Sequence, residues 1–135
     1  MRLTQEVVRE LLEYEPDTGE GYWRHRDIKW FEDGKRPANA MAIWNNRYGG
    51  KKAFTHTDRY GYKTGRLLNK VVRAHRIFFL HYHGYLPTLV EHRNGDRQDN
   101  NIDNLKDATY SENNRNRQCH RDKGEFIEYW DERYV

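Results

Sequence analysis

Cysteine, proline and methionine are scarce in this chain of 135 residues, which has one Cys, three Pro and two Met. A single cysteine, Cys119, excludes an intramolecular disulfide framework and a Cys-rich zinc site. The sequence also lacks an apolar run of about 18 residues that could form a transmembrane helix. No charged segment followed by an apolar one marks a signal peptide at the N-terminus. We therefore expect a soluble, intracellular protein of the cytoplasm with no membrane partner.

Aromatic residues are abundant by contrast, at 14% of the chain, with ten Tyr and four Trp. Hydrophobic residues make up 36% and charged residues 33%, so the core must be modest. Bulky aromatic side chains can fill such a core, which favours a folded chain over a disordered one. The length predicts one small domain with room for a subsidiary lobe.

The net charge of +3 is unevenly distributed along the chain. The first 20 residues carry two Arg against six acidic residues, and the last 12 carry one Arg against four. The segment between them must therefore carry a net charge of about +10. A basic body with acidic ends indicates a polyanionic partner, although a well-solvated surface would explain the same pattern.

The first third of the chain predicts a helix, a turn and a short strand. Apolar residues recur at helical spacing over residues 3–12, and Thr4 is a candidate N-cap. Residues 16–19 combine Pro, Asp, Thr and Gly, which is typical of a turn, and residues 21–24 follow as a short strand. Residues 31–52, which include Trp44, show no clear period, so we expect irregular structure there.

The middle of the chain changes to a pattern typical of antiparallel strands. Between residues 52 and 74, β-rich segments flank Asn69-Lys70, which predicts a hairpin turn. Residues 75–83 then predict a helix of about two turns that Gly84 terminates. An extended segment, Leu89-Val90, follows it and precedes Glu91 and His92.

The pair Glu91-His92 suits hydrolysis of a phosphodiester. That reaction needs a deprotonated water and a cation that neutralises charge developing on the phosphate. A histidine suits the role of base at neutral pH if a neighbour fixes its tautomer, so His92 is the candidate base and Asn104 the candidate orienting residue. Successive strand residues face opposite ways, which leaves Glu91 for a metal ion. Glu91 with one amide oxygen from Asn113 would suffice for Mg²⁺, which keeps several of its waters.

The residues around this pair predict the order strand, loop, strand and helix around one cation. Turn-forming residues at 94–96 and 99–101 indicate a compact loop held by side chains. A second short strand over residues 102–105 would return Asn104 towards His92. Asp107 or Thr109 would then cap a helix that continues through Arg117.

These residues resemble the signature of the HNH endonucleases of the ββα-metal superfamily, in particular the phage- and intron-encoded homing type with Asn in place of the last His. The resemblance covers residues 85–117 closely, and residues 11–19 and 74–76 also resemble what often precedes this module. The matching residues are Glu91-His92, Asn94-Gly95-Asp96, Asp99-Asn100, Asn104-Leu105, Ala108-Thr109 and Glu112-Asn113.

The resemblance implies an α+β fold, in which a ββα-metal nuclease module follows an N-terminal helix and a small antiparallel sheet. The expected domains are a DNA-contacting lobe over residues 1–84, the HNH module over 85–120 and an acidic tail over 121–135. By resemblance, His92 is the general base, Asn104 positions it, and Glu91 and Asn113 hold one Mg²⁺ or Mn²⁺ ion per active site. The expected activity is nicking or double-strand cleavage of DNA, in a phage or a bacterial host cell.

Glu91 departs from the family pattern, which usually has Asp directly before the base. The extra methylene displaces the carboxylate by roughly a bond length, and octahedral Mg²⁺ tolerates displacement poorly. We expect retained activity with a preference for Mn²⁺. The alternative is a weak or inactive HNH-fold module that binds DNA without turnover.

Basic residues along the chain are candidates for contact with double-stranded DNA, because phosphate contacts provide most of the affinity. His75 and Arg76 belong to this set, although His75 also suits a packed position before an apolar helix. RNA is a weaker option, since no RNA-binding motif is present. A monomer and a homodimer are both compatible with the sequence. The candidates are Arg93, Arg97, Arg115, Arg117, His75, Arg76, Arg47, Lys51, Lys52, Arg59, Lys63 and Arg66.

Overall fold

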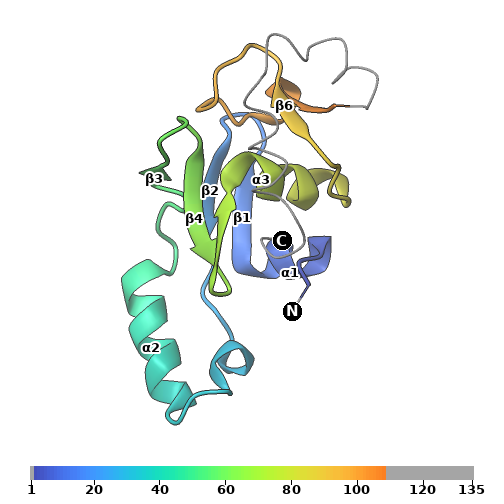
Figure 1. Cartoon of the computed structure of the whole chain (residues 1–135). Helices are drawn as coiled ribbons and strands as arrows, with labels where there is room; N and C mark the ends of the chain where they lie inside the picture. Colours follow the sequence, from blue (N-terminus) through green and yellow to red (C-terminus); the bar gives the residue numbers. More distant parts are fainter. Residues whose placement is uncertain (1, 109–135) are drawn as a thin grey trace.

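The computed structural model describes residues 2–108, in which short helices and small antiparallel sheets form an α+β fold (Figure 1). The predicted fold class is thereby confirmed. Among the described residues, none of the helices has the length and apolar character needed to cross a membrane. In chain order, the elements are α1 (Gln5–Leu11), β1 (Leu12–Glu15), β2 (Glu20–Trp23), the 3-10 turn η1 (Ile28–Phe31), α2 (Pro37–Tyr48), β3 (His56–Thr57), β4 (Lys63–Leu67), β5 (Lys70–Arg73), α3 (Ala74–His83), β6 (Val90–His92), the 3-10 turn η2 (Ile102–Asn104) and β7 (Leu105–Asp107).

The N-terminal helix and the hairpin after it follow from local sequence. The Thr4 hydroxyl caps α1 by accepting a hydrogen bond from the Val7 amide at 3.2 Å, as predicted. From Leu12 onwards, buried and exposed residues alternate along β1, which is the two-residue period of a strand. The helix therefore ends where this pattern begins. The turn before β2 ends at Gly19, whose φ of 81° favours glycine.

The expectation of irregular structure over residues 31–52 is wrong for residues 37–48, which form the helix α2. Pro37 suits the first turn of a helix, and the alanines that follow it are strong helix formers. The helix has no buried residue, so no continuous apolar stripe marks it in the sequence. Trp44, on this helix, packs edge-on against Trp23 of β2, with ring centroids 5.9 Å apart.

The sheet β3-β4-β5 contains the predicted hairpin, but its turn lies one residue earlier than expected. Leu67 pairs with Lys70, so the turn residues are Leu68 and Asn69. Both have positive φ, 50° and 69°, which is the conformation that matches the twist of the paired strands.

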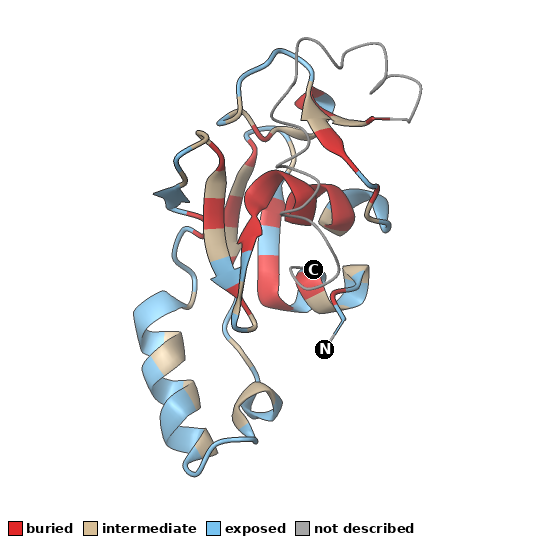
Figure 2. Cartoon of the chain, viewed as in Figure 1, coloured by how far each residue is buried: buried red, intermediate tan, exposed pale blue. Residues whose placement is uncertain are grey.

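Helix α3 forms the centre of the core, and its residues from Ala74 to Leu80 are all buried (Figure 2). Phe78 stacks on Tyr14 of β1 with centroids 4.4 Å apart and meets Phe54 edge-on at 5.3 Å. Gly21 of β2 permits this packing, because a Cβ there would lie 2.6 Å from the Phe78 ring. Gly84, with φ 89°, ends the helix as predicted.

Strands β6 and β7 join the same core through Leu89, Val90 and Leu105, which are buried with the residues of α3. The predicted domain boundary between residues 84 and 85 stays a prediction. The predicted second strand over residues 102–105 is wrong in its bounds, since Ile102–Asn104 is a 3-10 turn and the strand begins at Leu105. The Asn101 side chain caps this turn by accepting from the Asn104 amide at 3.1 Å. The predicted helix after Asp107 and the acidic tail lie outside the described residues.

Candidate active site

The loop between β6 and β7 is a compact reversal held by its own side chains, as predicted. The side-chain oxygen of Asn94 accepts a hydrogen bond from the Asp96 amide at 2.8 Å, and the Asp96 carboxylate accepts one from the Gln98 amide at 2.9 Å. Gly95 between them has φ 78°. Such side-chain turns fix the path of the chain that leaves the end of β6.

Asn104 holds this loop from inside. Its side chain is 7% exposed; its Nδ2 donates to the Asp99 carbonyl at 2.7 Å and its Oδ1 accepts from the Asn94 amide at 3.0 Å. Its own carbonyl accepts from the Arg93 amide at 2.8 Å. Asn104 therefore ties both ends of the loop to the start of β7.

Asn100, rather than Asn104, contacts the His92 ring. The Asn100 Oδ1 lies 2.8 Å from His92 Nε2. The strand register pairs His92 with Leu105, so the alternation of side chains directs Asn104 away from the ring. The side chain of Asn104 bonds instead to the backbone of the loop, and its predicted role in positioning His92 stays a prediction.

Asn100 is itself fixed by the β1–β2 hairpin. It is 1% exposed, and its carbonyl accepts from the Tyr14 hydroxyl at 2.5 Å. Burial raises the pKa of this hydroxyl, which keeps it a donor. Gly19 packs so closely that a Cβ there would lie 2.4 Å from the Asn100 carbonyl carbon. Neither Tyr14 nor Asn100 stood among the predicted site residues, although the resemblance of residues 11–19 to the family gave a signal for the hairpin.

The contact with Asn100 defines the tautomer of His92. An amide oxygen can only accept, so Nε2 carries the proton and the lone pair lies on Nδ1. Burial lowers the pKa of His92, and the bond to Asn100 opposes that shift. The ring is therefore neutral at neutral pH, which is the form able to accept a proton.

Two further rings surround His92. The His75 ring lies 4.9 Å from it and the Tyr62 ring 6.0 Å, and Tyr62 stacks on His75 at 5.1 Å. Tyr62 is buried and His75 is 1% exposed. Burial holds the pKa of His75 well below its ordinary value. His92 thus has a rigid apolar and aromatic environment on one side.

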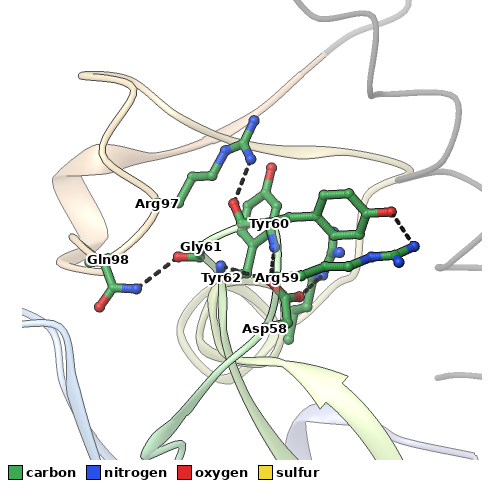
Figure 3. A network of polar contacts seen from close by, with 8 residues as sticks. Asp58, Arg59, Tyr60, Gly61, Tyr62, Arg97 and Gln98 are labelled. Atoms are coloured by element: carbon green, nitrogen blue, oxygen red, sulfur yellow. Dashed lines mark hydrogen bonds and ion pairs between the residues drawn. The ribbon is translucent and has the colours of Figure 1, made fainter.

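The loop before β4, which contains Tyr62, also contacts the loop between β6 and β7 (Figure 3). Arg97 donates to the Tyr60 carbonyl at 2.6 Å and lies over the Tyr62 ring, 4.8 Å from its centroid. Gln98 donates to the Gly61 carbonyl at 2.8 Å. These contacts join residues 97–98 to residues 60–62, so the position of His92 depends on both loops.

Glu91 precedes His92 on β6 and is partly exposed. Its register partner on β7 is Lys106, on the opposite side of the sheet from His92. The second predicted ligand, Asn113, lies outside the described residues, as do Arg115 and Arg117. Within residues 2–108, no group of three or more His, Cys, Asp and Glu could hold a metal ion. A carboxylate and an amide oxygen nevertheless suit a hard divalent cation that retains waters.

The prediction that His75 and Arg76 contact DNA is corrected, because both side chains are buried, at 1% and 3% exposure. Arg76 instead donates from Nη1 to the carbonyls of Pro87 and Thr88, each at 2.9 Å. It therefore holds the segment that leads into β6 against α3. Burial lowers the pKa of Arg76 to about 10.

The other described candidates for DNA contact reach the surface. Arg97 and Lys63 are partly exposed, and Lys52 forms an ion pair with Glu20 at 2.8 Å. These positions are compatible with DNA contact, which stays a prediction for each residue. The exposed candidates are Arg47, Lys51, Lys52, Arg59, Arg66 and Arg93.

Part of the chain matches a known protein family. Residues 72–115, which begin within β5 and include α3, β6, the active-site loop and β7, match a family model described as HNH endonuclease. No curated protein and no solved structure matches the chain.

Proposed function

We propose that the chain is a metal-dependent endonuclease that hydrolyses phosphodiester bonds in double-stranded DNA, on the basis that residues 72–115 match the HNH endonuclease family model. The family match supports a nuclease-type function in general. One observation carries the specific proposal: the neutral His92 ring, with Nε2 bound to Asn100 at 2.8 Å, presents a basic Nδ1 one residue from a carboxylate.

His92 is the proposed general base. Its Nδ1 takes a proton from the attacking water, and the bond from Nε2 to Asn100 holds the ring in the orientation and tautomer that this step needs. Asn104 acts as a positioning residue, since its bonds at 2.7 and 3.0 Å fix the loop on which Asn100 lies.

Glu91 and Asn113 are the proposed ligands of one divalent cation, Mg²⁺ or Mn²⁺. When bound, the cation neutralises charge that develops on the scissile phosphate. Glu91 is the middle residue of the three-residue strand β6, and the pairing of this strand with β7 fixes the position of its backbone. Its greater length than the usual Asp supports a preference for Mn²⁺.

Exposed basic residues would bind the phosphates of the duplex. Arg93, next to the base, and Arg66 on β4 are exposed, and Arg97 lies in the loop between β6 and β7 and is partly exposed. Arg115 and Arg117 would extend this set beyond the proposed ligand Asn113. A phage- or intron-encoded homing role in a bacterial host, the predicted cytoplasmic location and the oligomeric state stay predictions.

A second candidate function is DNA binding without turnover. Lys106 stands opposite Glu91 in the strand register, so an ammonium group can compete with a cation for this carboxylate. The nuclease is the preferred function, because a binding module has no need of a histidine with a fixed tautomer.

The test is cleavage of supercoiled plasmid with Mg²⁺ or Mn²⁺. We expect nicked or linear product from the wild type and none from His92→Ala, with similar DNA binding by both. His83→Ala, which changes an exposed histidine on α3, is the matched control and should cut normally. An intact plasmid with both ions, or equal cutting by His92→Ala, would contradict the proposal.

Calorimetric titration with Mn²⁺ alone separates the two candidate functions. The nuclease should bind the ion, and Asn113→Ala or Glu91→Ala should weaken that binding. A chain that binds DNA in a salt-dependent manner but takes up no ion supports the binding module instead.

A further inference from the structure

Helix α2 stands apart from the body of the molecule (Figure 1). Unlike α1 and α3, it has no buried residue, and most of its surface is exposed (Figure 2). A helix of 12 residues gains little from intrinsic propensity alone, so its contacts with the body must fix it.

The inner side of α2 is held by a small set of specific contacts. Asn45 exchanges two hydrogen bonds with the backbone of Arg26, one to its carbonyl at 3.0 Å and one from its amide at 2.7 Å. The Arg26 guanidinium lies over Trp44, 3.9 Å from the ring centroid, and Trp44 meets Trp23 of β2 edge-on. These contacts fix the rotation of the helix about its axis, which defines a constant outer face.

The outer face of α2 consists of Asn39, Ala42, Ile43 and Asn46, all exposed and spaced three and four residues apart. Ile43 is 60% exposed, the highest value among the exposed large apolar side chains of the described residues. The face therefore offers two amides, a methyl group and a branched alkyl group along one line.

All Lys, Arg, Asp and Glu residues of the segment 34–57, which contains α2, are basic, and the acids Glu32 and Asp33 precede it. From Gly34 to Thr57 the sequence has no Asp or Glu but has five basic residues. They lie at or beyond the two ends of the helix, and they are Lys35, Arg36, Arg47, Lys51 and Lys52. This distribution disfavours a second copy of the same face as the partner, because like charges would meet, and it is complementary to a polyanion.

We propose that the outer face of α2 enters the major groove of the duplex and contacts base edges. The inference rests on the proposed DNA substrate and adds the element that gives sequence preference. The major groove admits one α-helix; Asn amides pair with adenine, and alkyl groups contact the thymine methyl. The basic residues at the ends of the helix would bind the phosphates on either side of the groove.

The place of α2 in the fold adds a geometric consequence. Figure 1 shows α2 and β6 at opposite ends of the molecule, with β3 and β4 between them. Arg66 of β4 is exposed. The base pairs that α2 contacts should therefore lie away from the cleaved bond, on one side of it.

The test compares the wild type with Asn39→Ala/Asn46→Ala on a pool of random-sequence duplexes with Mn²⁺, followed by sequencing of the cut ends. Alanine preserves the helix, because it is the strongest helix former. We expect the wild type to prefer certain bases at adjoining positions away from the cut, by about five-fold or more each. The double variant should lose that preference while still cutting the pool. Arg2→Ala/Glu6→Ala, which changes two exposed polar residues in and next to α1, should keep it.

The possible outcomes distinguish failure of the α2 proposal from failure of the proposed nuclease. Equal preferences in wild type and the α2 variant, or no preference in the wild type, would overturn the role of α2. If the wild type binds the pool without cutting it, the nuclease fails, and the same comparison is made on the duplexes selected by binding. A wild type that neither binds nor cuts duplex DNA contradicts both proposals.

Discussion

Replacement of Asn100 tests whether the geometry around His92 matters for catalysis. Asn100→Ala removes the amide oxygen that lies 2.8 Å from His92 Nε2 and leaves the ring N–H without this acceptor in a partly buried environment. The bond has no replacement from water inside the core, since Asn100 is 1% exposed. The ring then loses the contact that selects its tautomer.

The magnitude follows from the cost of an unsatisfied buried donor, about 1–3 kcal/mol. At about 1.4 kcal/mol for each factor of ten, the rate of cleavage should fall by about 5-fold to about 150-fold. Asn100→Asp retains an acceptor oxygen at the same position and should lose less than Asn100→Ala. DNA binding should be unchanged in both variants, because Asn100 is buried.

The assay is cleavage of a duplex under single-turnover conditions with Mn²⁺, alongside DNA binding and urea unfolding of each variant. Unfolding separates a local effect at His92 from a loss of folded protein. Wild-type cleavage rates in Asn100→Ala, with the variant folded, would refute the view that Asn100 positions the base.

Three further predictions concern a pair of turn glycines, the proposed metal ligand and a buried histidine. Gly95→Ala should cost about 1 kcal/mol of unfolding free energy from its φ of 78° alone, as nothing lies within 4 Å of the new Cβ. Gly19 has a similar φ of 81°, but a Cβ there would lie 2.4 Å from the backbone of residues 100 and 101. In urea unfolding, Gly19→Ala should therefore lose about 1–3 kcal/mol more unfolding free energy than Gly95→Ala. Equal losses in the two variants would contradict the close packing of Gly19 against this backbone. Glu91→Asp should raise the Mg²⁺-supported cleavage rate relative to the Mn²⁺-supported rate, and an unchanged ratio would refute the importance of side-chain length. The pKa of His75 is lowered in the folded state, so only the unfolded chain binds a proton at this residue as the pH falls below about 6.5. The free energy of unfolding should therefore drop by about 1.4 kcal/mol between neutral pH and about pH 5.5. Unfolding measurements on His75→Phe at neutral pH and at about pH 5.5 should lack this part of the pH dependence.

Elements with a strong local signal could be predicted from the sequence. The spacing of apolar residues and Thr4 predicted α1, and Gly84 predicted the end of α3. The turn-forming residues after His92 predicted a loop held by side chains, which the structure confirms. In each case the determining contacts lie within a few residues of one another.

Features set by long-range contacts could not be predicted. Helix α2 depends on bonds between Asn45 and Arg26, 19 residues apart, and has no apolar stripe to reveal it. The partner of His92 depends on the register of β6 with β7 and on the turn at Ile102–Asn104, which together select Asn100 over Asn104. The burial of Arg76 depends on carbonyls of residues 87 and 88, which no local pattern indicates.

The most direct test of the central claim is chemical rescue of the proposed base. His92→Gly should bind duplex DNA like the wild type but leave it uncut with Mn²⁺, and added imidazole should restore part of the cleavage. The restored rate should depend on the concentration of neutral imidazole. Cleavage by His92→Gly at the wild-type rate without imidazole would contradict the role of His92 as the base.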